Sequence, residues 1–181
     1  MKANPYAQKA LIKLFLGFVK SISLRYVTNR EESEEILNDV FLKVFNNLHK
    51  YDPTQPFKAW LRTIVVHTAI DYYRKNQKYQ LQIDIDEIDA VDFNPDIISK
   101  ISSEEIMTMI QQLPPAYRMV FTLYVVEGYN HREIADLLNI KEGTSKSNLQ
   151  DARKKLQKMI LVAYPQLYYV YELRNLRINE N

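Results

Sequence analysis

Polar side chains follow one side of a predicted helix near the C-terminal end of the chain, at residues 145–159. At about 100° per residue, the opposite side is apolar or small and carries Ser145, Leu149, Ala152 and Leu156. The polar side offers hydrogen-bonding groups and excess positive charge, from Lys146, Ser147, Gln150, Asp151, Lys154 and Lys158. In the DNA major groove, lysine reaches guanine acceptors, glutamine pairs with adenine and serine serves several base edges, while other lysines meet phosphates. The pattern favours a DNA recognition helix, and a solvated helix face is the alternative interpretation.

A shorter amphipathic helix, HREIADLLN at residues 131–139, precedes this one. Small Ala135 would allow a close helix crossing, and Asn139 can take the left-handed conformation that ends a helix. Gly143 would supply backbone freedom to the turn, and we expect Thr144 to be the N-cap of the second helix. A helix, a short turn and a polar-faced helix together predict a helix-turn-helix.

A second candidate for nucleic-acid contact lies on a helix predicted for residues 57–78. One line of that helix carries an aromatic ring, hydrogen-bonding groups and terminal cations, namely Trp60, Thr63, His67, Asp71, Arg74 and Lys78. Such a line suits contact with unstacked bases and their phosphates. The alternative is that Trp60 covers the core and that the other side chains are solvated.

The helix predicted to begin at the EESEE run has a broad apolar arc suited to a core. The arc comprises Ile36, Leu37, Val40, Phe41, Val44, Phe45 and Leu48. Leu42 falls outside it, among acidic and amide side chains from Glu35, Asn38, Asp39 and Asn46. An apolar centre with a polar rim suits protein docking, and an isolated exposed leucine is the alternative.

Two small helical domains joined by an acidic tether account for the order of these segments, so we expect an all-α fold. The first domain is predicted over residues 1–78, and residues 79–102 form an acidic linker. The helix-turn-helix domain is predicted over residues 103–160. A tyrosine-rich tail at residues 161–181 is expected to pack as a further helix or to bind a regulator. The remaining predicted helices lie at residues 5–27, 103–113 and 116–127.

Composition excludes several other classes of protein. A net charge of +2 over 181 residues is too small to indicate a generally basic nucleic-acid binder, so the argument depends on where the charges lie. The absence of cysteine excludes a disulfide framework and fits a reducing cytoplasm. The apolar run LIKLFLGFV is shorter than the ~20 residues that span a bilayer, and no signal-peptide cleavage pattern follows it.

Motifs for catalysis, metals and cofactors are absent from the sequence. His49, His67 and His131 are far apart and lack the spacing of a helical metal site. The acidic run does not match the spaced ligands and glycine of a calcium loop. A glycine-rich phosphate loop, a nucleophile elbow and an obvious catalytic triad are also missing. We therefore expect a binding protein without a cofactor rather than an enzyme.

Three segments, in order, resemble bacterial RNA polymerase sigma factors of the extracytoplasmic-function group. They are EESEEILNDVFLKVFNNLHKYD, FKAWLRTIVVHTAIDYYRK and LPPAYRMVFTLYVVEGYNHREIADLLNIKEGTSKSNLQDARKKL. Together with the first helix they cover nearly the whole chain. His67 and Asp71 stand where relatives often have asparagine, and Ser145 replaces an apolar residue common in the group.

The resemblance implies a partner for each polar face. It implies that core RNA polymerase binds the face with Glu35, Asn38, Asp39, Leu42 and Asn46. It implies that the minus-10 element is read and opened by the line from Trp60 to Lys78. It implies that the minus-35 element is read by Thr144, Lys146, Ser147, Gln150, Asp151 and Lys154. An anti-sigma factor is a further expected partner, and the acidic linker would enter the RNA path of the polymerase.

Two other functions remain open from the sequence. A conventional helix-turn-helix regulator would bind duplex DNA as a dimer and would give no role to Leu42 or to the acidic tether. A sigma-like interaction adaptor would occupy polymerase or a regulator without needing Lys146 and Gln150.

Overall fold

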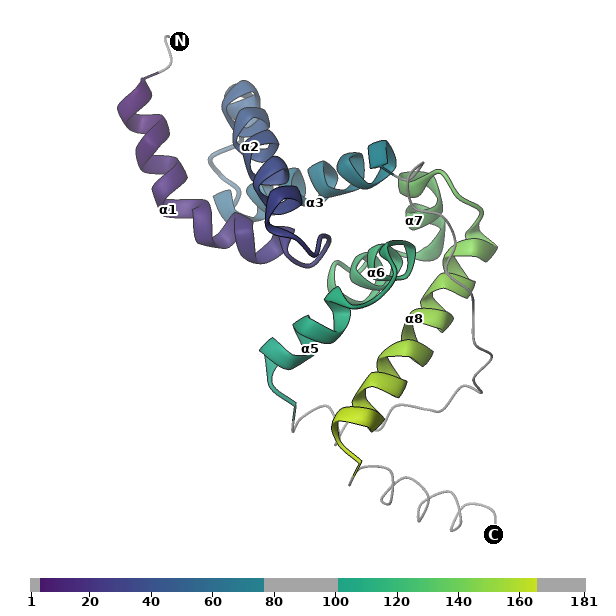
Figure 1. Cartoon of the computed structure of the whole chain (residues 1–181). Helices are drawn as coiled ribbons and strands as arrows, with labels where there is room; N and C mark the ends of the chain where they lie inside the picture. The colour runs from purple at the N-terminus through teal and green to yellow at the C-terminus, as the bar shows by residue number, and fades with distance from the viewer. Residues whose placement is uncertain (1–3, 77–100, 166–181) are drawn as a thin grey trace, which may run out of the picture. The chain divides into compact units, whose positions relative to one another are not determined.

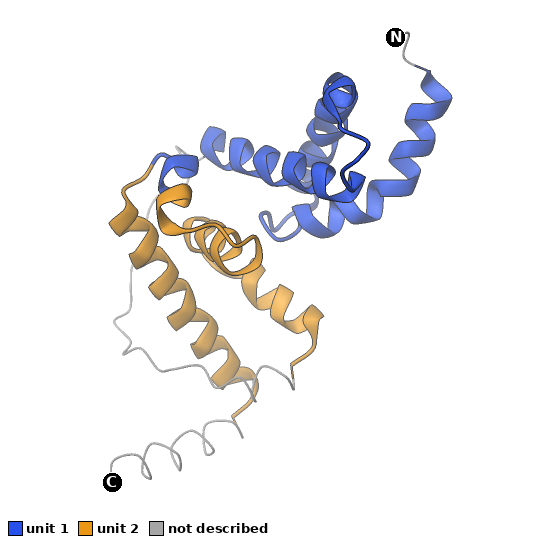
Figure 2. Ribbon diagram, turned by 180° about the vertical axis from the view of Figure 1, so that it is seen from behind, with its two compact units in different colours: residues 1–82, 135–139 blue, residues 83–134, 140–181 orange. Residues whose placement is uncertain are grey.

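The computed structural model describes residues 4–76 and 101–165 (Figure 1). Every regular element within these ranges is helical, which confirms the all-α class predicted from the sequence. Two compact units are present: residues 1–82 with 135–139, and residues 83–134 with 140–181 (Figure 2). The predicted acidic linker falls largely within residues 77–100, outside the described residues, as does most of the predicted tail at 166–181. The domain limits therefore stay predictions.

The first unit contains α1 (Pro5–Ser23), α2 (Arg30–Asn47), a 3-10 turn η1 (Leu48–Lys50) and α3 (Phe57–Asn76). Asparagine side chains cap two of these helices. The Asn4 Oδ1 accepts the Tyr6 backbone N–H at 3.0 Å, and the Asn29 Oδ1 accepts that of Glu32 at 2.8 Å. Each of the three α-helices packs against the other two around a shared apolar core. Its fully buried side chains include Val19, Ile22, Ile36, Val40, Val44, Leu61 and Val65.

The predicted end of the first helix and the predicted core position of Leu48 are wrong in this unit. The first helix stops at Ser23 instead of residue 27, because the backbone N–H groups of Arg25 and Tyr26 bond to carbonyls three residues back and tighten the last turn. The second helix ends at Asn47, and the 3-10 turn that follows takes Leu48 off the apolar arc of α2. The predicted core residue Leu48 is therefore 42% exposed.

The second unit contains α5 (Ser103–Gln111), α6 (Pro115–Phe121), a π-helical segment η3 (Thr122–Val126), the first half of α7 (His131–Leu138) and α8 (Glu142–Ala163). The second half of α7, from Ala135, is grouped with the first unit. A complete capping box begins α5, in which the Ser102 and Glu105 side chains each bond to the other's backbone N–H. The underside of α8 packs against α6 and α5. The buried cluster there comprises Ile110, Leu113, Ala152 and Leu156.

The turn before α8 is shorter than predicted. Asn139 has the expected left-handed backbone, with φ of 55°. However, α8 begins at Glu142, because the extended Lys141 already offers its carbonyl to the Ser145 N–H at 3.1 Å. Thr144 is therefore the third residue of the helix, and the prediction that it is the N-cap is wrong. Gly143 is also helical, without the positive φ that the predicted freedom would have used.

Candidate nucleic-acid interface

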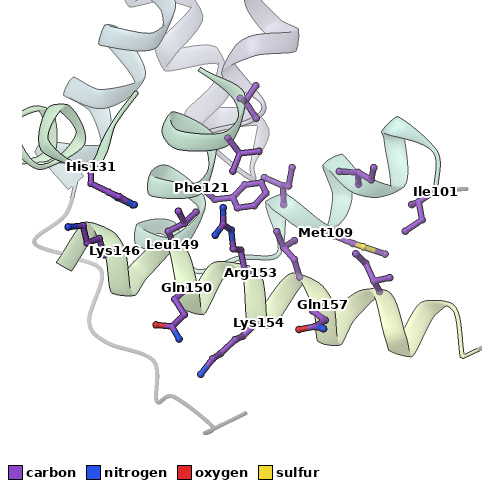
Figure 3. A pocket seen from close by; sticks show the side chains of 16 residues that line it. Ile101, Met109, Phe121, His131, Lys146, Leu149, Gln150, Arg153, Lys154 and Gln157 are labelled. Atoms are coloured by element: carbon purple, nitrogen blue, oxygen red, sulfur yellow. The ribbon is translucent and has the colours of Figure 1, made fainter. Parts of the chain in front are cut away.

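The outer face of α8 carries the side chains predicted to contact base edges. Thr144, Lys146, Ser147 and Gln150 are exposed, whereas Lys154 is half-buried. Figure 3 shows Gln150 and Lys154 projecting from the side of α8 opposite to Leu149. The predicted inner stripe is buried throughout: Ser145, Leu149, Ala152 and Leu156. This burial fixes which side of α8 meets solvent.

Three of the predicted contact residues already have partners on the same chain. The first is Ser147, whose hydroxyl donates to the Thr144 carbonyl at 3.1 Å. Lys146 Nζ lies 2.6 Å from the Glu142 carboxylate one turn earlier, and this hydrogen bond, followed by the charge of Lys146, lowers the pKa of Glu142. The Asp151 carboxylate is half-buried and accepts a hydrogen bond from the Tyr117 hydroxyl. Burial and then this carboxylate raise the pKa of Tyr117. Asp151 therefore interacts with α6, and its carboxylate is less available to contact a base.

A polar cluster beneath the start of α8 was missed from the sequence. The His131 Nδ1 lies 2.9 Å from the hydroxyl oxygen of Ser145, which is fully buried. The imidazole also stacks on the Tyr124 ring, with 4.6 Å between ring centroids. A serine on the otherwise apolar inner stripe of α8 was the available signal, because a buried hydroxyl needs a partner.

An apolar groove of about 710 Å³ runs along α8 in the second unit (Figure 3). Aliphatic and aromatic side chains form most of its wall, including Ile106, Phe121 and the exposed Val125. The His131 imidazole and five cationic or amide side chains of α8 line the rest, the latter being Lys146, Gln150, Arg153, Lys154 and Gln157. An apolar floor with a basic rim suits a partner helix that is amphipathic and acidic.

Most of the line predicted on α3 faces solvent. Thr63, His67, Asp71 and Arg74 are exposed, and Lys78 lies outside the described residues. Trp60 differs, because it is half-buried within an aromatic cluster. Its ring centroid lies 5.2 Å from that of Tyr51 and 5.4 Å from that of Phe57. Trp60 therefore fits both interpretations in part. Its ring packs against aromatic neighbours of the core, and part of the ring stays exposed for contact with a base.

Two ion pairs connect α2 with α3, and each contains one residue of a predicted face. Lys43 Nζ lies 2.7 Å from the Asp71 carboxylate, and Lys75 Nζ lies 3.3 Å from that of Glu35. Exposed pairs of this kind contribute little to stability. Their consequence is electrostatic, because Lys43 offsets the negative charge that Asp71 would bring near a DNA strand.

The α2 face contains all five predicted polymerase contacts on its exposed side: Glu35, Asn38, Asp39, Leu42 and Asn46. The Leu42 side chain is 59% exposed, among these polar neighbours. An exposed leucine between carboxylate and amide groups is the geometry expected of a docking surface.

Within residues 4–76 and 101–165, no group of three or more His, Asp or Glu side chains could hold a metal ion. The same residues contain no helix that is long and apolar enough to cross a membrane.

Comparison with known proteins agrees with this arrangement. Residues 11–79 match the family Sigma-70 region 2, and residues 103–156 match Sigma-70, region 4. Among curated relatives, the ECF RNA polymerase sigma factor SigE of Mycolicibacterium smegmatis is 26% identical over 81% of this chain and 59% of its own length. SigM of Bacillus subtilis is 28% identical over 81% of this chain and 91% of its own. SigW of the same organism is 25% identical over 88% and 91%.

The chain belongs to the sigma-70 family of RNA polymerase sigma factors, in its extracytoplasmic-function (ECF) group. The resemblance drawn from the sequence is thereby confirmed. The chain is a promoter-directing sigma factor.

Proposed function

We propose that α8 reads the minus-35 element in the major groove, with Lys146, Ser147 and Gln150 at base edges. Thr144 and Lys154 would contact the flanking phosphates. The observation that carries this proposal is the two-sided character of α8, whose buried underside leaves only this face to meet DNA. An α-helix fits the major groove, where amide and cationic side chains distinguish base pairs. Asp151, bonded to Tyr117, would act by limiting how deeply the helix enters.

The first unit would read and hold the melted minus-10 strand. Thr63, His67 and Arg74 offer hydrogen bonds and positive charge along α3, and the exposed part of Trp60 offers a surface on which a base can stack. Asp71, neutralised by Lys43, would contribute a hydrogen-bond acceptor rather than a net charge. Lys78 completes the line in the sequence.

The α2 face would dock on core polymerase through Leu42 and its polar neighbours Glu35, Asn38, Asp39 and Asn46. The polymerase supplies catalysis of RNA synthesis, and this chain supplies promoter choice. Reading surfaces this small bind DNA weakly by themselves, and joining both to one polymerase raises their effective concentration. This arrangement also fits a net charge of only +2. The chain would work in the cytoplasm, where the polymerase is.

Transcription by purified core polymerase, with and without this protein, tests the proposal. The templates are a library of genomic fragments, and the RNA starts are sequenced. We expect new starts that share two spaced upstream elements. If polymerase binds the protein but makes no new starts, the adaptor function replaces the promoter-reading one. If polymerase does not bind, the docking role of α2 is wrong.

An anti-sigma factor is proposed as a second partner, and the groove along α8 supports it. The groove pairs an apolar floor with the basic side chains Lys146, Arg153 and Lys154. An inhibitor with an acidic amphipathic helix would fill this groove and cover Lys146 and Gln150 at the same time. Competition between such an inhibitor and minus-35 DNA for purified protein tests this, and simultaneous binding of both would contradict it.

A further inference from the structure

The first turn of α8 needs an anchor that its own sequence does not supply. Lys141 occupies the N-cap position and makes no capping hydrogen bond with its side chain. Uncapped first turns leave backbone N–H groups unsatisfied and tend to fray. Yet this turn carries Thr144, Lys146 and Ser147, which the proposed function places against DNA. A side chain from outside the helix can hold this turn in one orientation.

His131 provides such an anchor. Its Nδ1 shares a 2.9 Å hydrogen bond with the hydroxyl of Ser145, on the inner side of that first turn. Ser145 is fully buried, so its hydroxyl has no access to water in place of the imidazole. The bond ties the residue directly before Lys146 to the first residue of α7.

His131 is itself held from two directions. Asn130 and Glu133 form a reciprocal capping box at the start of α7, with hydrogen bonds of 2.8 and 2.9 Å that fix the backbone at His131. The imidazole stacks on Tyr124. The guanidinium carbon of Arg153, two turns further along α8, lies 6.0 Å from the centroid of the same Tyr124 ring. The imidazole therefore has little freedom to turn away from Ser145.

We propose that His131 is a positioning residue for promoter recognition, which acts through Ser145 to hold the first turn of α8 in its base-reading orientation. The proposal rests on minus-35 reading by α8. It gives a reason for the polar residue at position 145, because an apolar side chain there would pack without fixing the orientation of the turn. A hydrogen bond prefers one geometry, so the pair limits rotation of the first turn about the helix axis.

The test measures promoter discrimination by the complete holoenzyme. Initiation is compared on a promoter recovered from the fragment library and on a copy with one minus-35 base pair changed. His131→Phe keeps a ring to stack on Tyr124 and loses the hydrogen bond. Ser145→Ala removes the same bond from the other side with little change in volume. We expect each to lower the discrimination ratio about two- to tenfold, the worth of one hydrogen bond.

Non-additivity is the decisive signature. The double variant should discriminate no worse than either single variant, because both remove one interaction. His131→Asn, which keeps a polar atom near the position of Nδ1, should retain more discrimination than His131→Phe. His49→Phe, the same chemical change at an exposed position of the first unit, is the matched control and should leave the ratio unchanged. Additive losses, or unchanged ratios in both single variants, would overturn the proposal.

Gln150→Ala distinguishes a failure of this proposal from a failure of minus-35 reading by α8, on which the proposal rests. If Gln150→Ala lowers the ratio and the two single variants do not, His131 has no positioning role but α8 still reads DNA. If Gln150→Ala also leaves the ratio unchanged, base reading by α8 is wrong and the role of His131 is overturned with it.

Discussion

Individual side chains on α8 divide into those that can read bases and those that can only position the helix. Gln150 is exposed and offers both a donor and an acceptor, the combination that distinguishes adenine from other bases. Lys154 carries charge alone and is half-buried along its stem. Asp151, although on the polar side by sequence, is engaged with Tyr117. Equal spacing on a helix therefore does not give equal roles.

Replacement of Gln150 by alanine should reduce discrimination at one base pair of the minus-35 element. One bidentate amide contact contributes about 1–3 kcal/mol of discrimination, so the preference for the correct base pair should fall by at least about fivefold. Lys154→Ala is the matched variant, and it should weaken binding equally on all sequences and reduce the salt dependence by about one phosphate contact. Holoenzyme binding to promoter variants across salt concentrations measures both. The same sequence-independent loss for both variants would contradict base reading by Gln150.

The imidazole of His131 should make stability depend on pH. Its pKa is lowered first by burial and then by the positive charge of Lys146, with a smaller lowering by Arg153 and an opposing effect of Glu142. Free histidine titrates near 6.5, so below about pH 6.5 the unfolded chain binds a proton more readily than the folded one. We expect the free energy of unfolding to fall as pH drops from 7 to 5.5.

Denaturant titrations at half-unit steps of pH measure this slope. His131→Phe should flatten it between pH 7 and 5.5. The carboxyls of Glu105 and Glu142 also have lowered pKa values, against an ordinary value of 4.5, so their stabilisation is lost only at more acidic pH. An unchanged slope in His131→Phe would show that another group titrates in this window.

Among the elements, α5 depends most visibly on its N-terminal cap. It has only nine residues, too few to be stable without tertiary packing and capping. Ser102 and Glu105 cap it reciprocally, and the Tyr164 hydroxyl after α8 donates to Glu105 at 2.6 Å. The end of α8 and the start of α5 are thereby joined, at the position where Ile101 packs against Ile160.

Ser102→Ala should destabilise this unit by about 1 kcal/mol, the usual cost of losing a serine cap. Ser102→Asn, which can also accept the capping hydrogen bond, should cost only a few tenths. Urea denaturation of the full chain, with probes on the second unit, gives both values. If Ser102→Ala and Ser102→Asn are equally destabilised, the cap is not the reason that α5 begins at Ser103.

Over the whole molecule, the two units carry different tasks, so their variants should fail in different assays. Leu42 belongs to the first unit and is exposed, whereas Gln150 belongs to the second. A defect in polymerase docking should lower transcription from every promoter alike. A defect in α8 should change which promoters are chosen.

Leu42→Glu should weaken binding to core polymerase by at least about tenfold, because it puts a charge at the centre of the docking face. Folding should be unaffected, since the side chain is 59% exposed. Leu14→Glu is the matched control, since Leu14 is an exposed leucine of α1 with 74% of its surface in solvent. Equal core affinity for Leu42→Glu and Leu14→Glu would show that the polymerase docks elsewhere.

The sequence by itself determined the features that repeat along a helix. Apolar spacing predicted the buried stripe of α8 and most of the buried arc of α2, and it left Leu42 outside that arc. Composition and the three family segments predicted an all-α sigma factor. Asn139 was expected in the left-handed conformation and has it. These features are local, since burial on a helix repeats with its own period and backbone preferences act within a few residues.

Only the tertiary structure decided which side chains meet across elements. Lys43 with Asp71, Tyr117 with Asp151, and His131 with Ser145 are 28, 34 and 14 residues apart, and no periodicity within one helix connects them. The early start of α8 and the exposure of Leu48 were also decided by packing. The sequence allows turns of several lengths at each place, and the packing of the neighbouring helices selects one of them. Helical spacing tells which way a side chain points, and only the packed fold supplies what it meets there.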